Sequence, residues 1–357
     1  MDDAGAGSEM PGGPVPEHDV VLVLAGGNAL GAYQAGVYQA LHEGGVRPGR
    51  IVGASIGAYN GAIIAGNAPD QRLARLAEFW RPGAAGGEQD WMGSLPDTWR
   101  RSWDAIGTLL AGRPGMFAPL GSNAFAPTPP AMYDTRPMKA LLARVIDLDR
   151  LNGEAVHYTA TAVDLETGEE VSFDNRNRRI GIDHVRASGA LPPSFPPIEI
   201  DGRLFVDGGL AETLPLDPVL ANPPERPTLC IAVDLLPALG ERPTTLGMMA
   251  ERAQDLTFAI QSRRTIARWQ EHYALVPHDR QQPVTLACLT YAAQQPEVVG
   301  KAMDFSPASV RFRWDAGYRD GCELVAMLDN GTIKVGGPGL QVHHLPNQHV
   351  ARAEHPG

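Results

Sequence analysis

Cysteine is scarce in this sequence. Only Cys230, Cys288 and Cys322 occur among its 357 residues. An odd number of cysteines at wide spacings does not form a disulfide framework, and a chain of this length can bury a core large enough to fold without covalent cross-links. The cysteine content therefore argues against the small disulfide-rich secreted class and is typical of a protein in a reducing compartment.

Long apolar runs are also absent. Hydrophobic residues make up 43% of the chain, yet no run approaches the roughly 18 residues that a membrane-spanning helix needs. The N-terminal residues, which begin Met1-Asp2-Asp3, have neither the basic nor the apolar region of a secretory signal. We therefore expect a cytoplasmic protein whose contact with a membrane surface is at most transient and peripheral.

Positive charge is in short supply. Lysine and arginine number 30 against 41 aspartates and glutamates, which gives a formal net charge of −11. Such a chain is not attracted to nucleic acid, which is therefore excluded as a partner. Metal-ligand spacings and nucleotide-binding loops are missing too, so we expect no metal and no cofactor. A histidine-rich stretch near the C-terminus (His343, His344 and His349) is more typical of a solvated tail than of a metal site.

Short apolar runs alternate with helix patterns along most of the chain. Residues 20–24 and 50–54 predict buried strands, and a helix pattern follows each of them. This alternation predicts the α/β fold class, with a mainly parallel sheet covered by helices on both faces. Further strands are predicted at 156–163, 170–173, 229–233 and 284–289, long helices at 245–272 and 307–328, and disordered tails at 1–17 and 336–357.

Residues 80–130 have a different character. They contain four of the six tryptophans among glycine, proline and arginine, namely Trp80, Trp91, Trp99 and Trp103. Tryptophan is amphipathic and suits a lipid interface, so this stretch could form a lid over a site. The alternative is a helical cap whose tryptophans pack onto the core. The sequence leaves both open.

The first motif with chemical meaning is Gly53-Ala54-Ser55-Ile56-Gly57. This Gly-x-Ser-x-Gly pattern lies where a predicted strand meets a predicted helix. A sharp turn at such a junction exposes the serine hydroxyl at the end of the sheet, and the flanking glycines remove side chains that would clash. The start of the helix adds partial positive charge near the hydroxyl. The context favours Ser55 as a nucleophile.

A glycine-rich loop, Gly26-Gly27-Asn28, ends the first predicted strand. Its backbone N–H groups could hold an oxyanion or a phosphate. The spacing to Gly31 does not fit the dinucleotide-binding pattern Gly-x-Gly-x-x-Gly. A tight turn with close helix–sheet packing at Gly31 is the structural alternative.

The third motif is Asp207-Gly208-Gly209, at the end of a short predicted strand. A carboxylate in this position can point into a cleft, although an ordinary Asp-Gly-Gly turn has the same sequence. The motif alone does not decide between the two.

Together these motifs resemble the patatin-like phospholipase family. The glycine-rich loop, the serine pentapeptide and the Asp-Gly-Gly turn occur in the family's order and separation, and the segments 30–36 (LGAYQAG), 187–193 (ASGALPP) and 195–197 (FPP) are also similar to the family. The resemblance covers residues 18–220. Residues 230–330 resemble the C-terminal extension of a bacterial subgroup, a region without an assigned role.

The resemblance implies a three-layer α/β/α acyl hydrolase domain over residues 18–225 and an α/β extension over 226–335. It implies an enzyme that hydrolyses lipid esters, of the phospholipase A, lysophospholipase or esterase type. Ser55 then matches the nucleophile and Asp207 the base of a two-residue dyad. Gly26, Gly27 and Asn28 match the oxyanion loop. Supporting positions are the elbow glycines Gly53 and Gly57, together with Gly31, Gly208 and Gly209.

One departure from the family pattern concerns Asn28, which replaces the third glycine of the loop. Asparagine tolerates positive φ and keeps its backbone donor, but its side chain can crowd the oxyanion. Loss of one oxyanion donor typically lowers kcat by about 10²–10³. The alternative function is therefore a catalytically weak scaffold that binds lipid or protein. A second alternative is an α/β-hydrolase that uses Asp234 with His272 or His278.

Overall fold

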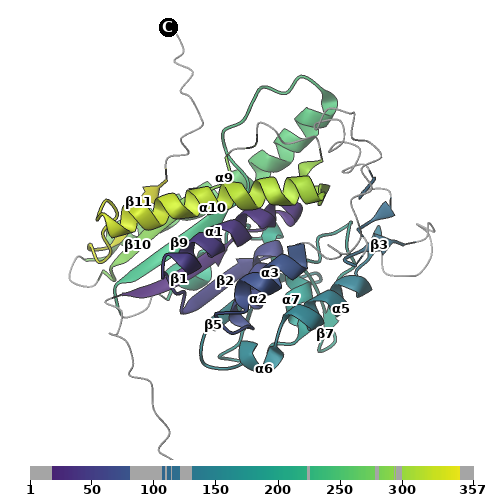
Figure 1. Cartoon of the computed structure of the whole chain (residues 1–357), viewed down its shortest axis with the longest axis horizontal. Helices are drawn as coiled ribbons and strands as arrows, with labels where there is room; N and C mark the ends of the chain where they lie inside the picture. The colour runs from purple at the N-terminus through teal and green to yellow at the C-terminus, as the bar shows by residue number, and fades with distance from the viewer. Residues whose placement is uncertain are drawn as a thin grey trace, which may run out of the picture.

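A computed structural model of the chain describes residues 18–80, 107–108, 111–113, 115–120, 131–222, 226–277, 281–292, 294 and 300–345. The described residues form a central nine-stranded sheet between layers of helices (Figure 1). Its strands are β1 (Asp19–Leu24), β2 (Arg50–Ala54), β5 (His157–Asp164), β6 (Glu170–Asp174), β7 (Ile198–Ile200), β8 (Arg203–Asp207), β9 (Thr228–Asp234), β10 (Val284–Thr290) and β11 (Leu340–His344).

The sheet is mainly parallel, as the sequence predicts. Its order is β11-β10-β9-β1-β2-β5-β8-β7, with β6 paired to β5. All pairings from β11 to β5 are parallel, whereas β6 and β8 pair with β5 in the antiparallel sense. A small second sheet pairs β3 (Ala118–Pro119) with β4 (Tyr133–Asp134).

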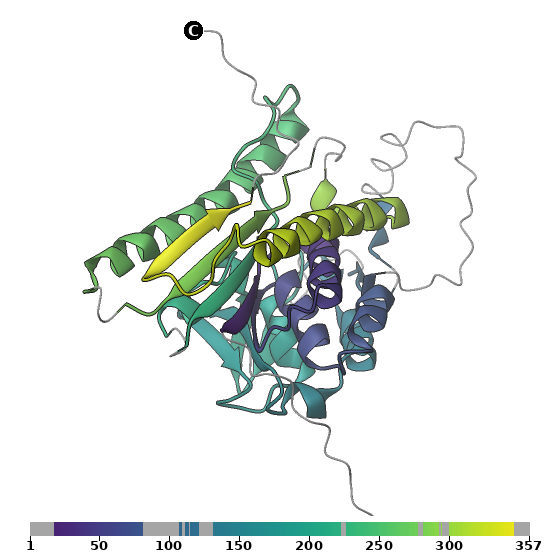
Figure 2. The same ribbon diagram turned by 60° about the vertical axis from the view of Figure 1, so that its left-hand side comes forward.

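Helices cover both faces of the sheet. They are α1 (Ala32–Glu43), α2 (Ile56–Ala65), α3 (Arg72–Trp80), α5 (Arg136–Val145), α6 (Leu148–Leu151), α7 (Ile182–Ser188), α8 (Asp217–Leu220), α9 (Leu246–Leu275) and α10 (Pro307–Asp329). Figure 2 shows α9 on the opposite side of the sheet from α1 and α10. Successive side chains of β1 point to opposite faces of the sheet and so pack into two cores, Leu22 and Leu24 into one and Val21 and Val23 into the other. This confirms the predicted three-layer α/β/α architecture.

The last long helix, α10, packs closely on α1. A Cβ atom at Gly36 would lie 1.9 Å from the Trp314 carbonyl oxygen, and one at Gly317 would lie 1.9 Å from the Tyr33 carbonyl oxygen. At the same interface the Tyr33 hydroxyl donates to Asp320 at 2.7 Å. The C-terminal region is thereby joined to the first helix of the chain.

The helix boundaries follow from capping residues. The side chain of Thr245 accepts from the Met248 N–H at the start of α9, and Ser306 accepts from the Ser309 N–H at the start of α10. Pro307 occupies the first turn of α10, where its missing N–H costs nothing. Both long helices lie where the sequence predicts them and end within three residues of the predicted positions.

The predicted C-terminal tail begins too early. Residues 340–344 form β11, which pairs in parallel with β10 from Val284↔Leu340 to Cys288↔His344. The segment has only two apolar residues, Leu340 and Val342, and both are partly buried against the core beside α9. An edge strand needs little hydrophobicity because its backbone hydrogen bonds to β10 hold it in place. Residues 1–17 and 346–357 lie outside the described residues.

Of the tryptophans in 80–130, Trp80 ends α3 and is buried, with its indole N–H donating to Asn60 at 3.0 Å. Trp91, Trp99 and Trp103, on which the lid hypothesis depends, lie outside the described residues. None of the helices in the described ranges is both long and apolar enough to cross a membrane.

Candidate active site

One strand, β5, aligns two loops that are distant in the sequence. β2 runs parallel to β5 and ends with Ala54 opposite Thr161. β8 approaches β5 in the antiparallel sense and ends with Asp207 opposite Ala162. β6 pairs with both Thr161 and Ala162 and so occupies one edge of β5. β2 and β8 therefore both lie along the opposite edge, one after the other. The residue after Ala54, which is Ser55, therefore meets the last residue of β8.

Ser55 occupies a strained turn between β2 and α2. Its backbone dihedrals are φ 54° and ψ −124°, a region that non-glycine residues rarely adopt. Only glycine fits two residues before and two residues after Ser55. A Cβ at Gly57 would lie 2.1 Å from the Leu24 carbonyl oxygen, and one at Gly53 would lie 2.5 Å from the Ala58 nitrogen. The predicted strand–turn–helix geometry is present, and the positive end of α2 lies at Ser55.

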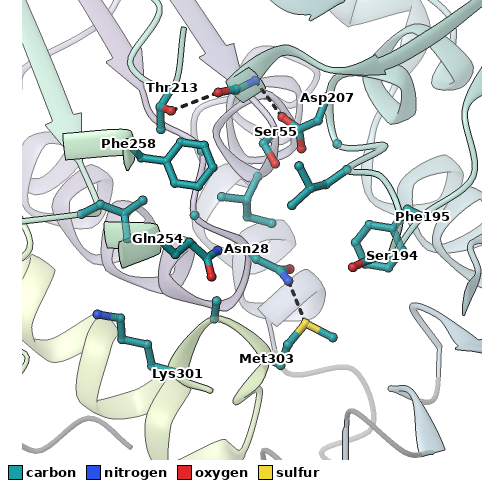
Figure 3. A pocket seen from close by; sticks show the side chains of 18 of the residues that line it. Asn28, Ser55, Ser194, Phe195, Asp207, Thr213, Gln254, Phe258, Lys301 and Met303 are labelled. Carbon is teal, nitrogen blue, oxygen red and sulfur yellow. Dashed lines mark hydrogen bonds between the residues drawn. The ribbon is translucent and has the colours of Figure 1, made fainter. Parts of the chain in front are cut away.

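The Asp207 carboxylate lies beside Ser55 in a buried position (Figure 3). Asp207 is 2% exposed, and its Oδ1 accepts the Gly209 N–H at 2.8 Å. Burial raises the pKa of Asp207 to about 7, although hydrogen bonds from the Ser55 side chain and the Gly209 N–H act to lower it. A carboxylate with this pKa is a better proton acceptor near neutral pH than a free aspartate.

The glycine-rich loop differs from the sequence prediction at Gly26. The Gly26 N–H donates to the Thr213 carbonyl oxygen at 2.9 Å, so it is not available to an oxyanion. Among the described residues no acceptor takes the N–H of Gly27 or Asn28. Asn28 has φ 52°, and its side-chain amide donates to Met303 Sδ at 3.1 Å. The asparagine side chain therefore has a partner of its own in the C-terminal region (Figure 3).

A cavity of about 460 Å³ opens in front of Ser55 and Asp207. This volume lies within the range of small-molecule sites. The glycine-rich loop Gly26-Gly27-Asn28 lines the cavity on one side. On another side lie residues of α9 and of the 3₁₀ helix η4 (Lys301–Met303). The C-terminal extension, whose role the sequence did not reveal, thus forms part of the wall.

Comparison with known proteins shows the family of this chain. The profile of the patatin-like phospholipase family matches residues 22–220, more than half of the chain. This chain belongs to the patatin-like phospholipase family. Membership supports a lipid hydrolase type of activity.

Two curated relatives cover the same region. An uncharacterized NTE family protein of Mycobacterium tuberculosis is 31% identical over 203 residues, which is 56% of this chain and 45% of that protein. Patatin-like phospholipase domain-containing protein 7 of Mus musculus is 30% identical over 201 residues, 56% of this chain and 12% of the mouse protein. The match therefore spans less than half the length of these relatives.

Solved structures with related folds are more distant. VipD from Legionella pneumophila aligns with 87% of this chain and 67% of its own chain, at a TM-score of 0.44 and 14% identity. The type III effector ExoU aligns with 90% of this chain and 54% of its own, at a TM-score of 0.36 and 14% identity.

The remaining patatin-like glycines allow close packing around the site. A Cβ at Gly31 would lie 2.6 Å from the side chain of Ile56, the residue after Ser55. A Cβ at Gly208 would lie 2.4 Å from the Thr161 carbonyl oxygen. Gly209 contributes the N–H that Asp207 accepts. These supporting positions therefore exclude a side chain on steric grounds, since a Cβ at Gly209 would also lie only 3.0 Å from Asp207 Oδ1.

Two further residues of this patatin-like site were not identified from the sequence. Ser188 is buried at the end of α7, and its hydroxyl oxygen accepts the Ser55 N–H at 2.9 Å. Thr213 accepts the Gly26 N–H through its carbonyl and donates its hydroxyl to the Gly209 carbonyl at 3.1 Å. Ser188 lies inside the family-like segment 187–193, which was a usable signal. Nothing in the local sequence singles out Thr213.

The α/β-hydrolase alternative finds no support in the described residues. Asp234 accepts the Leu235 N–H at 2.8 Å, while the His272 ring packs 5.2 Å from the ring of Trp269. No described histidine lines the cavity, and His278 is outside the described ranges. Nor do the described residues bring three or more histidine, cysteine or acidic side chains together as a metal site.

Proposed function

We propose that this protein is a serine hydrolase of carboxylic esters, of the phospholipase A, lysophospholipase or esterase type, with a Ser55–Asp207 dyad. The observation that carries the proposal is the Asp207 carboxyl. It is buried beside Ser55 in the wall of the cavity, and its pKa is raised to about 7. A purely structural Asp-Gly-Gly turn does not require this arrangement.

The proposed reaction is acyl transfer in two steps. The Ser55 hydroxyl attacks the ester carbonyl carbon while Asp207 accepts its proton, and the tetrahedral intermediate collapses as the alcohol leaves with that proton. Water then attacks the acyl-serine with Asp207 as the base, which releases the fatty acid and restores the hydroxyl. Asp207 alternates between base and acid, so a pKa near neutrality suits both roles.

The oxyanion donors are proposed to be the N–H groups of Gly27 and Asn28. Both residues line the cavity, and no described acceptor competes for these hydrogens. The first loop residue, Gly26, leaves room for Ser55, because a Cβ at this position would lie 3.2 Å from Ser55 Cβ. Donors fixed before the reaction stabilise the developing charge without reorganisation.

Labelling by a fluorophosphonate probe tests this proposal. The probe forms a covalent bond only with an activated serine, and we expect mass spectrometry to locate the adduct on the peptide that contains Ser55. Turnover of a p-nitrophenyl ester should accompany it. If the folded wild-type protein is neither labelled nor active, the proposal fails and a binding scaffold becomes the better interpretation.

The pH dependence of turnover should report the Asp207 carboxyl. Because the base must be ionised and its pKa is about 7, kcat/KM should rise with pH through this value and level off above it. At pH 5 we expect about 1% of the plateau value. The measurement is the initial rate of p-nitrophenyl ester hydrolysis between pH 5 and 9, with circular dichroism to confirm that the protein stays folded.

Asp234 provides the control for this profile. Burial also raises its pKa, to about 6, but its hydrogen-bond donors are the backbone N–H groups of Leu235 and Leu236 rather than Ser55. The substitution Asp234→Asn should therefore leave the midpoint near 7. A plateau that extends down to pH 5 in the wild type, or a midpoint that moves in Asp234→Asn, would contradict the role given to Asp207.

A further inference from the structure

The cavity has two chemically different parts. One part, here called the aromatic lobe, contains Phe117, Phe195 and Phe305, whose rings contact one another at centroid distances of 5.3 and 6.0 Å. In Figure 3, Ser194 and Phe195 lie on one side of the Asn28–Met303 contact. This lobe offers apolar surface to an acyl chain.

The second part, here called the polar lobe, is built by the C-terminal extension. It contains Glu251, Gln254 and Asp255 of α9 and Lys301 of η4, all of which line the same cavity. Figure 3 shows Gln254 and Lys301 on the other side of the Asn28–Met303 contact from Phe195. An ester held at Ser55 with its acyl chain in the aromatic lobe would direct its alcohol towards this polar lobe.

The polar lobe holds a buried ion pair. Lys301 Nζ donates to Asp255 at 2.6 Å and to Gln294 at 2.6 Å, and both charged side chains are less than one tenth exposed. Two of the three ammonium hydrogens are thus taken by these partners. Glu251 accepts the backbone N–H of Lys301 at 3.2 Å, and among the described residues no side chain pairs with its carboxylate.

The formal charge of the polar lobe is therefore negative. Glu251 and Asp255 contribute two carboxylates against the single ammonium of Lys301. The neighbouring cation, Arg252, is not part of the lobe: it does not line the cavity, and its guanidinium donates to the carbonyls of Pro237 and Ala238. A net carboxylate repels an anionic alcohol but accepts hydrogen bonds from hydroxyl groups.

We propose that the polar lobe is a leaving-group subsite that selects esters of uncharged polyols, such as glycerol, over esters whose alcohol carries a net negative charge. Hydroxyl groups satisfy Glu251 as donors, exchange hydrogen bonds with the amide of Gln254, and accept the remaining Lys301 hydrogen. An anionic phosphate can use only the last two. This inference rests on the proposed hydrolase function and assigns a role to the C-terminal extension.

The test compares two esters with the same acyl chain, a monoacylglycerol and a lysophosphatidylglycerol, both dilute in micelles of a neutral detergent. The measurement is made at about pH 8, above the pKa of about 7 of Asp207, so that the proposed base is ionised. Wild type should hydrolyse the neutral glycerol ester with the higher kcat/KM. In Glu251→Gln the preference should shrink by about tenfold, since one unit charge is removed from the lobe.

Glu271→Gln is the matched control. Glu271 lies on the same helix, is exposed and does not line the cavity. Its replacement by glutamine therefore removes the same charge from the protein but not from the polar lobe. Its substitution should leave the preference unchanged. Equal kcat/KM for the two esters in wild type, or the same preference in Glu251→Gln as in wild type, would overturn the inference.

The failure of the inference differs from the failure of the hydrolase proposal. Hydrolysis that depends on Ser55 but does not distinguish the two esters contradicts the polar lobe alone. If neither lipid nor a p-nitrophenyl ester is hydrolysed in a Ser55-dependent manner, both proposals fall.

Discussion

Replacement of Ser55 by alanine is expected to lower ester turnover on the order of 10⁴-fold or more. In the proposed mechanism the hydroxyl forms the acyl-enzyme bond, and the described residues of the strained turn offer no second nucleophile. The variant should fold normally, because alanine keeps the Cβ and the backbone N–H that donates to Ser188. Kinetics with a p-nitrophenyl ester and fluorophosphonate labelling measure the loss.

Asp207→Asn should be nearly as severe. The amide is isosteric and can still accept the Gly209 N–H through its oxygen, but it cannot accept the Ser55 proton. Residues that act as one unit have non-additive effects, so the double variant Ser55→Ala/Asp207→Asn should be no slower than Ser55→Ala alone. A double variant that loses a further tenfold would show that the two side chains act separately.

Ser194→Ala serves as the matched control for the nucleophile. Ser194 also lines the cavity, and its hydroxyl is visible near Phe195 in Figure 3. Nothing in the described structure places it beside an activating carboxylate. Its substitution should lower turnover by less than about tenfold. Loss of labelling in Ser194→Ala but not in Ser55→Ala would contradict the assignment of the nucleophile.

Gly317→Ala is expected to destabilise the protein by about 3–5 kcal/mol, although it adds only one methyl group. The new Cβ would lie 1.9 Å from the Tyr33 carbonyl oxygen, which is about half of a normal contact distance. Because backbone atoms form both sides of the contact, the methyl can be accommodated only if α10 moves away from α1. That movement would also disturb Gly36 and the Tyr33–Asp320 hydrogen bond.

Urea unfolding followed by circular dichroism measures this effect. Gly49→Ala is the control, because a Cβ there would meet nothing within 4 Å. It should change the free energy of unfolding by less than about 1 kcal/mol. If Gly317→Ala is no less stable than Gly49→Ala, the close contact between α1 and α10 does not contribute to the fold.

The local features of the site were predictable. Ser55 was assigned from the glycines around it, and the structure shows why those glycines are required: a side chain at Gly57 would collide with the end of β1. The positive φ of Asn28 agrees with the expectation that asparagine tolerates this region. Such features depend on a few consecutive residues, so a short pattern contains most of the information about them.

The features that were missed or mispredicted depend on distant partners. The Gly26 N–H was assigned to the oxyanion, but a carbonyl 187 positions away, that of Thr213, accepts it. The strand at 340–344 was assigned to a tail because its own composition is polar, while its backbone partner is β10. Neither contact leaves a signature in the local sequence.

The sequence by itself determined the α/β class, the nucleophile and base candidates Ser55 and Asp207, and the likeness to the patatin-like family, because each depends on a local pattern of strand, turn and glycine. Only the tertiary structure decided that β5 brings Ser55 and Asp207 together, that burial raises the pKa of Asp207 to about 7, and that α9 and η4 line the cavity with a charged lobe. These properties arise from contacts between residues far apart in the chain, and from the exclusion of water that such contacts produce.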